Sequence, residues 1–206
     1  MPENLATRSY STLDEILEAI RIAAREQPDS MLFVGIDGAG GSGKSTLALR
    51  LSEALDESIV VHIDDFADWT DGANWQLSTF AERVLEPLKA GITAKYQRYD
   101  WPTDSLGDWF EIAPGKIAIV EGVTAVRSDL REYWAVSVFV DCPRDVRLER
   151  GVTRDGEEIR SKWTDIWMPG EDAYFDRDRP REHAQFLFDG NSESDESGES
   201  DSANPG

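Results

Sequence analysis

The feature that most constrains the fold is a glycine-rich stretch between a largely apolar run and a segment of helical character. It satisfies the pattern G-x-x-x-x-G-K-[ST] and reads Gly38-Ala39-Gly40-Gly41-Ser42-Gly43-Lys44-Ser45. The run before it, Met31 to Asp37, is typical of a buried parallel strand, and residues 44–55 after it indicate a helix. Such a loop can turn its backbone N–H groups toward phosphate oxygens, because glycine permits the dihedral angles that this requires. The sequence therefore predicts a phosphate-binding loop.

The residues that follow the loop carry the charge and the ligand that a nucleoside triphosphate needs. A helix that begins near Lys44 directs its positive N-terminal end at the phosphates. Lys44 is expected to neutralise the β- and γ-phosphates, and the Ser45 hydroxyl is expected to ligate Mg²⁺, with Thr46 nearby as a helper. We therefore expect residues 38–46 to bind ATP together with Mg²⁺.

Two acids follow the second predicted strand, residues 58–63. In an open α/β sheet the carboxyl ends of the strands face the ligand crevice. Asp64 comes first after the strand, so it is the candidate for the base that takes a proton from an attacking hydroxyl, or for a group that holds Mg²⁺ through water. Asp65 is expected to cap or support this site beside the substrate. His62, within the strand, is expected to pack in the interior.

A further strand, residues 116–121, repeats this arrangement. Its apolar residues lead into Glu121, and Gly122 follows at once. An acid in this position resembles the acid of a Walker B strand, so Glu121 is expected to bind Mg²⁺ or its waters. The expected metal ligands are therefore Ser45, Asp64 and Glu121.

The rest of the chain alternates strands and helices. Further strands are expected at residues 94–101, 109–112, 136–141 and 185–189, the first two as short strands or a hairpin. Strands separated by helices imply βαβ units, and hence a three-layer α/β fold with a mostly parallel sheet. Residues 1–30 are expected to form a helix packed on the main domain, which spans residues 31–190 and carries a short helical lid around 150–170. Residues 191–206 are rich in Ser, Asp, Glu and Gly, and we expect a disordered acidic tail there.

Local signals mark where several helices begin and end. Capping-box patterns at Thr12 and Thr79 predict two helices, the first ended by Pro28 and the second near Gly91. Pro143 is expected in the first turn of another helix, which runs through residue 148.

Composition narrows the class of protein. The net charge is −20, from 41 acids and 21 bases, and this charge would repel the backbone of a nucleic acid. No apolar stretch approaches the roughly 20 residues of a membrane span, and the N-terminus does not resemble a signal peptide. The single cysteine, Cys142, is expected to be a buried structural thiol in a reducing compartment, so a cytoplasmic protein is expected. The oligomeric state is left open.

Several motifs together resemble the uridine kinase-like family of P-loop kinases, whose relatives include pantothenate kinase and phosphoribulokinase. The resemblance covers residues 32–190. It is carried, in order, by the loop, Ile63-Asp64-Asp65-Phe66, Tyr99-Asp100-Trp101, Val120-Glu121-Gly122, Phe139-Val140-Asp141-Cys142-Pro143, Arg147-Leu148-Glu149-Arg150 and Arg154-Asp155.

The resemblance implies a role for each matching residue. Asp64 matches the family's catalytic aspartate, and Glu121 matches an acid near the metal and the acceptor. Tyr99 matches an aromatic residue that packs on the acceptor base. Arg150 and Arg154 fall where lid arginines close on the phosphates, a task that suits a permanently charged bidentate group. Arg147 is either a third such residue or part of a solvated helix face. The strand end at residues 188–190 is expected close to the adenine.

The chain also departs from the family pattern. The family's segment after the tyrosine contains a histidine that recognises the base, whereas Tyr99 is followed by Asp100-Trp101-Pro102-Thr103-Asp104. The paired lid arginines are thinned, since Gly151 follows Arg150. The aromatic residues between 163 and 179 are expected to pack in the core.

The resemblance thus implies transfer of the γ-phosphoryl group of MgATP to a hydroxyl of a small molecule. A nucleoside is the acceptor that the resemblance favours. Two alternatives remain open: a kinase for a non-nucleoside acceptor such as pantothenate or a sugar, and an ATPase or switch without such an acceptor. A GTPase would carry an N-K-x-D motif and an ABC-type ATPase an L-S-G-G motif, and the sequence contains neither.

Overall fold

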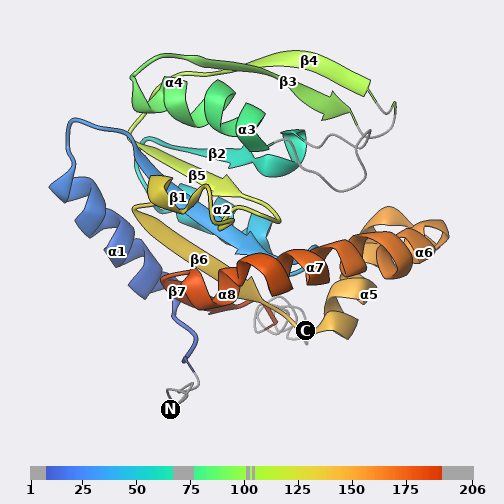
Figure 1. Ribbon diagram of the computed structural model, residues 1–206. Helices are drawn as coiled ribbons and strands as arrows, with labels where there is room; N and C mark the ends of the chain where they lie inside the picture. The colour runs from blue at the N-terminus through green and yellow to red at the C-terminus, as the bar shows by residue number, and fades with distance from the viewer. Residues whose placement is uncertain (1–7, 67–76, 101–102, 104, 192–206) are drawn as a thin grey trace, which may run out of the picture.

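The computed structural model describes residues 8–66, 77–100, 103 and 105–191, and it shows a sheet between two layers of helices (Figure 1). Five strands run in the order β2-β5-β1-β6-β7, and each neighbouring pair is parallel. The strands are β2 (Ser58–His62), β5 (Ile117–Glu121), β1 (Leu32–Gly38), β6 (Val136–Asp141) and β7 (Phe186–Asp189). The three-layer α/β fold with a parallel sheet is thereby confirmed.

Two hydrophobic cores, one on each face of the sheet, follow from the alternation of side chains along the strands. Along β1, Val34 and Ile36 belong to one core and Phe33 to the other. Helices α1 (Leu13–Glu26) and α2 (Lys44–Glu53) cover the first face. The helical segment 77–89 and the strand β3 (Ala94–Asp100) cover the second.

The remaining elements are short helices, one hairpin and the helices near the C-terminus. The hairpin pairs β3 with β4 (Ser105–Ile112) in an antiparallel sheet of its own. The others are η1 (Ile63–Phe66), α3 (Leu77–Phe80), η3 (Ala81–Leu85), α4 (Glu86–Lys89), η4 (Arg131–Tyr133), α5 (Arg144–Asp155), η5 (Glu157–Ile159), α6 (Arg160–Lys162), η6 (Trp163–Trp167), α7 (Met168–Asp178) and α8 (Pro180–His183). In the described part of the chain, no helix has both the length and the apolar character that crossing a bilayer requires.

The helix starts differ in part from the predicted ones. The capping box at Thr12 is confirmed, since Thr12 Oγ1 accepts the Glu15 N–H at 3.2 Å and Glu15 Oε2 accepts the Thr12 N–H at 2.8 Å. The prediction at Thr79 is wrong, because the chain is already helical at Leu77. The buried row that begins at Phe80 holds α3, η3 and α4 as one continuous helix against the sheet, and this packing overrides the local signal.

The helix after β6 is longer than predicted. Pro143 is its N-cap residue, one position before the first turn, and α5 runs past residue 148 to Asp155. The face of α5 that carries Arg147 and Val152 is buried, which sustains the helix through Gly151. It ends at Gly156, whose φ of 101° no longer continues a right-handed helix.

A close contact in the second core explains the glycine inside β1. A β-carbon at Gly35 would lie 2.8 Å from Cδ2 of Trp134. The indole is fixed there, because its Nε1 donates a 2.8 Å hydrogen bond to the Ala125 carbonyl oxygen and the side chain is buried. Gly35 therefore leaves the space that the indole fills.

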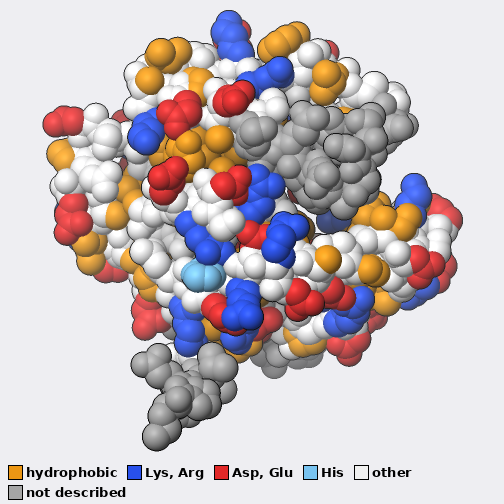
Figure 2. Space-filling view, in the orientation of Figure 1, with side chains coloured by type: hydrophobic (Ala, Val, Ile, Leu, Met, Phe, Trp, Pro, Cys, Tyr) orange, Lys and Arg blue, Asp and Glu red, His pale blue; other side chains and the backbone are white. Residues whose placement is uncertain are grey.

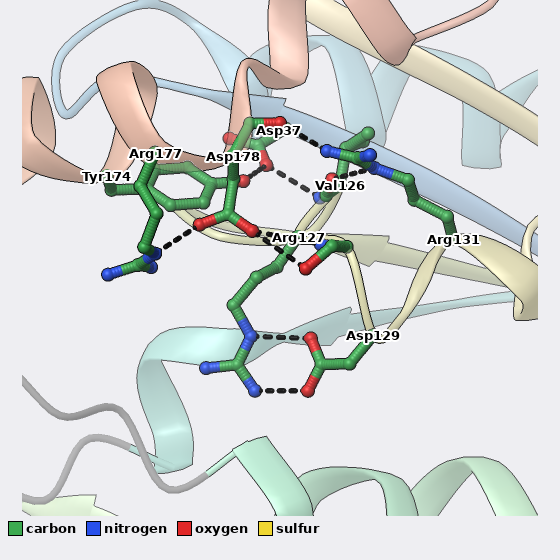
Figure 3. A network of polar contacts seen from close by, with 9 residues as sticks. Asp37, Val126, Arg127, Asp129, Arg131, Tyr174, Arg177 and Asp178 are labelled. Atoms are coloured by element: carbon green, nitrogen blue, oxygen red, sulfur yellow. Dashed lines mark hydrogen bonds and ion pairs between the residues drawn. The ribbon is translucent and has the colours of Figure 1, made fainter.

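A buried aspartate at the end of β1 ties three parts of the fold together (Figure 3). Asp37 is fully buried, and its Oδ1 accepts the Gly38 N–H at 2.6 Å. Its Oδ2 accepts the Val126 N–H and the Tyr174 hydroxyl, both at 2.6 Å. The carboxylate thus joins the start of the glycine-rich loop, the segment after β5 and helix α7.

A second set of contacts holds the end of α7 to the same segment (Figure 3). Asp178 Oδ1 accepts hydrogen bonds from the backbone N–H and the hydroxyl of Ser128, at 3.2 and 3.0 Å. Arg131 donates to the carbonyl oxygens of Val126 and Asp178. Helix α7 is therefore anchored to the sheet at Tyr174 and again one turn later.

We predict that Gly35→Ala destabilises the fold by about 1–3 kcal/mol, because the added methyl group overpacks the indole of Trp134. Gly170→Ala is the control, since a β-carbon at this helical glycine meets no atom within 4 Å. It should instead stabilise the protein by up to about 1 kcal/mol. Urea unfolding followed by circular dichroism measures both changes, and equal stability of Gly35→Ala and the parent would contradict this account of the contact.

We also predict that Asp37 makes the free energy of unfolding depend on pH. Burial raises the pKa of Asp37 to about 6, although the hydrogen bonds from Tyr174, Val126 and Gly38 and the charge of Lys44 oppose the rise. The folded state therefore holds this proton more tightly than the unfolded state, and ionisation of Asp37 costs stability as the pH rises from about 4 to about 6. The free energy of unfolding of the parent, minus that of Asp37→Asn, should fall by up to about 3 kcal/mol across this range.

Tyr174→Phe is the matched variant for this measurement. It removes a hydrogen bond that lowers the pKa of Asp37, so the fall should extend to higher pH than in the parent. Urea unfolding at a series of pH values gives both curves. A difference between the parent and Asp37→Asn that is flat from pH 4 to 7 would rule out this linkage.

Candidate functional site

The glycine-rich loop lies at the carboxyl end of β1 and leads into α2. Gly41 has a φ of 74°, and a β-carbon there would lie 2.6 Å from the carbonyl oxygen of Arg147. Gly43 has a φ of 99° and is the N-cap residue of α2. Both positions require glycine, because other residues rarely adopt such angles. The backbone of the loop can therefore turn around a ligand that lies at the positive N-terminal end of α2.

Inside the loop, one cation and one hydroxyl lie buried. Lys44 is 7% exposed, and its Nζ donates a 2.9 Å hydrogen bond to the Ala39 carbonyl oxygen, so the ammonium group lies against the loop. Ser42 Oγ is buried and has no hydrogen-bond partner among the described residues. A phosphate oxygen would satisfy both groups, which is consistent with the predicted phosphate loop.

Glu121 lies beside the loop and connects it to β2. Its Oε1 accepts the Ser45 hydroxyl at 3.1 Å and is 2.5 Å from His62 Nδ1. Burial raises the pKa of Glu121, but the hydrogen bond from His62, the charge of Lys44 and the hydrogen bond from Ser45 outweigh burial, so the pKa is lowered. Glu121 is therefore an anion next to Ser45, which suits a carboxylate that holds magnesium.

His62 was expected to pack in the interior, and this expectation is wrong. Its side chain is 41% exposed and pairs with Glu121, and this hydrogen bond raises the pKa of His62. The two residues are direct partners in the parallel register of β2 and β5. The pairing could have been found in the sequence only by assuming that these two strands are neighbours.

Asp64 lies in η1, directly after β2. A β-carbon at Gly122 would lie 3.5 Å from Asp64 Oδ1, so the carboxylate is next to the end of β5. Solvent reaches the side chain, yet protein surrounds it densely enough to reduce its solvation. This loss of solvation raises the pKa of Asp64; the charge of Lys44 opposes the rise and that of Glu121 adds to it. Asp64 is therefore a stronger base than an ordinary aspartate and remains open to a ligand.

Asp65, the next residue, contacts the hairpin. Its Oδ2 accepts the Tyr96 hydroxyl at 3.1 Å, and its Oδ1 is 2.9 Å from Arg98 Nε. The Arg98 guanidinium lies 4.4 Å from the centre of the Phe110 ring. Both oxygens of Asp65 thus have protein partners, an arrangement suited to the supporting role that was expected beside the substrate.

Tyr99 lies on the same strand as Arg98 and is half-buried. It pairs with Leu106 just past a shift in register between Gln97 and Tyr99. The expected role of Tyr99 depends on its surroundings, and Trp101, Pro102 and Asp104 of the same motif lie outside the described residues.

Helix α5 carries four arginines, and three of them, Arg147, Arg150 and Arg154, share one face of the helix but have different partners. Arg147 is buried, and its Nη1 is 3.0 Å from Glu171 Oε2, so it does not belong to a solvated face. Arg150 Nη1 donates a 2.9 Å hydrogen bond to the Gly190 carbonyl oxygen. Arg154 makes a bidentate ion pair with Asp155.

Arg154 lies within reach of the charge of Asp64, and both Arg154 and Arg150 line a cleft beside α5. The hydrogen bond to Asp155 raises the pKa of Arg154, and the charge of Asp64 adds to this effect, so the two groups are within electrostatic reach. Arg150 lies at a cleft of about 520 Å³ between the outer face of α5 and Asn191, just after β7. Arg154 also lines this cleft.

The last strand packs closely on the phosphate loop. A β-carbon at Gly190 would overlap the carbonyl oxygen of Ser42. Cys142 is half-buried near Arg150, and burial raises the pKa of its thiol. The end of β7 therefore lies directly against the phosphate loop.

Two residues of η6 and α7 reach the loop, and the sequence did not mark them as loop contacts. Glu171 Oε1 accepts the Gly40 N–H at 2.7 Å, and a β-carbon at Gly40 would lie 2.8 Å from the ring of Trp163. Trp163 is buried, as expected for an aromatic residue of this segment. No local sequence signal marks Glu171, because its partner lies 131 positions away.

Charges of both signs lie around α7. Figure 2 shows lysine and arginine side chains near the middle of the displayed face, with aspartate and glutamate side chains among them. The cation at the loop is instead a buried group, since Lys44 is held against the Ala39 carbonyl oxygen.

Comparisons with known proteins identify the family of this chain. A family model described as an AAA domain matches residues 34–173. A uridine kinase from Alkaliphilus metalliredigens is 31% identical over 176 residues, which are 76% of this chain and 81% of that protein. A uridine kinase from Clostridium perfringens is 27% identical over 144 residues, 62% of this chain and 69% of that protein.

Solved structures show the same fold. A possible uridine kinase from Bacillus stearothermophilus superposes with a TM-score of 0.61 at 23% identity, over 85% of this chain and all of that one. A putative fructose transport system kinase from Silicibacter sp. TM1040 gives a TM-score of 0.67 at 23% identity, over 86% of this chain and 98% of that one. With the loop, the sheet and these relatives in agreement, the chain belongs to the uridine kinase-like family of P-loop kinases.

Proposed function

We propose that this kinase transfers the γ-phosphoryl group of MgATP to a hydroxyl of a small molecule, and that the acceptor is a nucleoside. The observation that carries the proposal is the meeting of Lys44, Ser45, Glu121 and Asp64 at the carboxyl ends of β1, β5 and β2. A cation, a hydroxyl and two acids at one crevice are the groups that phosphoryl transfer uses. The relatives named uridine kinase support the choice of a nucleoside.

The phosphates are assigned to residues 38–46. Backbone N–H groups of the loop, the end of α2 and the ammonium group of Lys44 supply positive charge, and Ser42 Oγ is a buried hydroxyl still open to a partner. Ser45 and Glu121 would hold Mg²⁺ directly and Asp64 would hold it through water, since all three present the hard oxygen atoms that this ion prefers. When bound, Mg²⁺ neutralises charge on the phosphates.

Asp64 is assigned the role of the base that accepts the proton of the acceptor hydroxyl. As that oxygen attacks the γ-phosphorus, its proton passes to the Asp64 carboxylate, and ADP leaves with the electrons of the broken P–O bond. Reduced solvation raises the pKa of Asp64, which makes the carboxylate a better proton acceptor. Its openness to solvent leaves room for the acceptor.

The two lid arginines receive different tasks in this proposal. Arg154, within electrostatic reach of Asp64, is assigned to the charge that develops on the transferred group. Arg150 holds the end of β7 through Gly190 and borders the cleft, which we assign to the adenosine part of ATP. Tyr99 and Asp65, on the hairpin side, are assigned to the acceptor.

We predict that Asp64→Asn lowers the turnover of the best acceptor on the order of 10²- to 10⁴-fold, because the amide cannot take the proton. Its affinity for MgATP should stay within a few-fold of the parent, as measured by calorimetry. ADP formation with MgATP and a panel of nucleosides, pantothenate and sugars identifies the acceptor. Near-parental turnover by Asp64→Asn, with MgATP binding intact, would contradict the role of the base.

Two controls separate the possible outcomes of this experiment. Asp172→Asn alters an exposed acid that pairs with Arg144 at 2.7 Å, and it should leave turnover unchanged. Lys44→Ala should abolish turnover, since the phosphates lose their buried cation. Phosphorylation of pantothenate or a sugar alone would replace the nucleoside, and ATP hydrolysis indifferent to every acceptor would favour a switch.

A further inference from the structure

We infer that the Glu171 carboxylate is an internal occupant of the phosphate loop, that it competes with the triphosphate for the loop, and that it thereby sets the affinity for the nucleotide. The inference rests on the proposed function, because it concerns the same phosphate site. It assigns a role to a residue that lies on α7, outside the loop and outside the strand ends that carry the other groups of the site.

The contact has the geometry of an anion bound to the loop. Glu171 Oε1 accepts the Gly40 N–H at 2.7 Å, within the range of a charge-assisted hydrogen bond. Glu171 is 8% exposed, so water does not replace this contact. A backbone N–H of the loop is the type of donor that a phosphate oxygen would use. The Glu171 carboxylate therefore occupies a position at the loop that would also suit an oxygen atom of a phosphate group.

The electrostatic surroundings are those that a phosphate would also need. Burial raises the pKa of Glu171, whereas the hydrogen bond from Gly40 and the charges of Lys44 and Arg147 oppose the rise. Lys44 is therefore close enough to act on the carboxylate. A bound triphosphate would place further negative charge beside Glu171 and draw on the same lysine, so the two anions oppose one another.

The second partner of Glu171 holds it loosely enough to be released. Arg147 meets the carboxylate through Nη1 alone, at 3.0 Å, and its Nε is buried without a partner among the described residues. A bidentate pair would hold the carboxylate more firmly. Gly40 contacts Oε1 and Arg147 contacts Oε2, so the carboxylate can leave the Gly40 N–H while its other oxygen stays paired with Arg147.

The test compares MgATP binding to the parent, Glu171→Gln and Asp172→Asn by calorimetry, together with the thermal unfolding of each protein without nucleotide. Glutamine keeps the shape of the side chain and removes its charge. Asp172→Asn is the matched control, since it removes one charge from the same helix at an exposed position. We expect Glu171→Gln to bind MgATP on the order of tenfold more tightly, although it unfolds at a lower temperature because Arg147 loses its ion pair.

Tighter binding of MgATP together with a lower unfolding temperature distinguishes competition from a purely structural role of Glu171. Unchanged or weaker binding of MgATP by Glu171→Gln, while the parent binds, would overturn the inference and leave the proposed function intact. No binding by any of the three proteins would overturn the proposed function itself. Should Glu171→Gln fail to fold, Glu171→Asp decides by the same measurement. Its shorter side chain keeps the charge for Arg147 but withdraws from the Gly40 N–H, so tighter binding supports the inference and equal or weaker binding overturns it.

Discussion

The rest of this structure depends on a loop whose backbone N–H groups need negative partners. Two contacts with the protein itself satisfy part of that need, Asp37 at the Gly38 N–H and Glu171 at the Gly40 N–H, while the Ala39 carbonyl oxygen accepts a hydrogen bond from the ammonium group of Lys44. The neighbouring elements approach the loop so closely that no side chain fits at Gly190 or Gly41. The sheet, α5 and α7 are therefore arranged around the geometry of this loop.

The distribution of charge follows from the same requirement. A chain with a net charge of −20 can bind a polyanion only where its cations are held in fixed positions. Lys44 is buried against the loop, Arg147 is buried beside it, and Arg154 lies within reach of Asp64. Acids lie next to these cations, because the hydrogen bond from His62 and the charge of Lys44 keep Glu121 ionised. Opposite charges thus border the space assigned to the phosphates and the acceptor.

The sequence predicted the parts of the fold that local patterns determine. The apolar strands, the loop and the acids at the strand ends follow from periodicity and spacing, so these patterns alone were enough to predict that Lys44, Ser45, Asp64 and Glu121 lie close together at the carboxyl ends of the strands. Features that depend on which strands are neighbours could not be predicted. His62 has the sequence pattern of an interior residue, and only the register of β2 with β5 brings it to Glu121, while Glu171 has a partner 131 positions away. At Thr79 the local signal was misleading, because the helix already begins at Leu77 and is held against the sheet by Phe80 and the buried residues that follow it.

The way in which α7 is anchored bears on how Glu171 could leave the loop. Tyr174 bonds to Asp37 and Asp178 bonds to Ser128, so the helix is fixed to the sheet one and two turns beyond Glu171. These contacts involve no atom of the loop beyond the start at Gly38, and a nucleotide need not break them. A change of rotamer at Glu171 would therefore be enough to free the Gly40 N–H, while the backbone of α7 stays in place. Such a movement costs far less than undocking a helix, which allows a buried carboxylate to act as a reversible occupant of the loop.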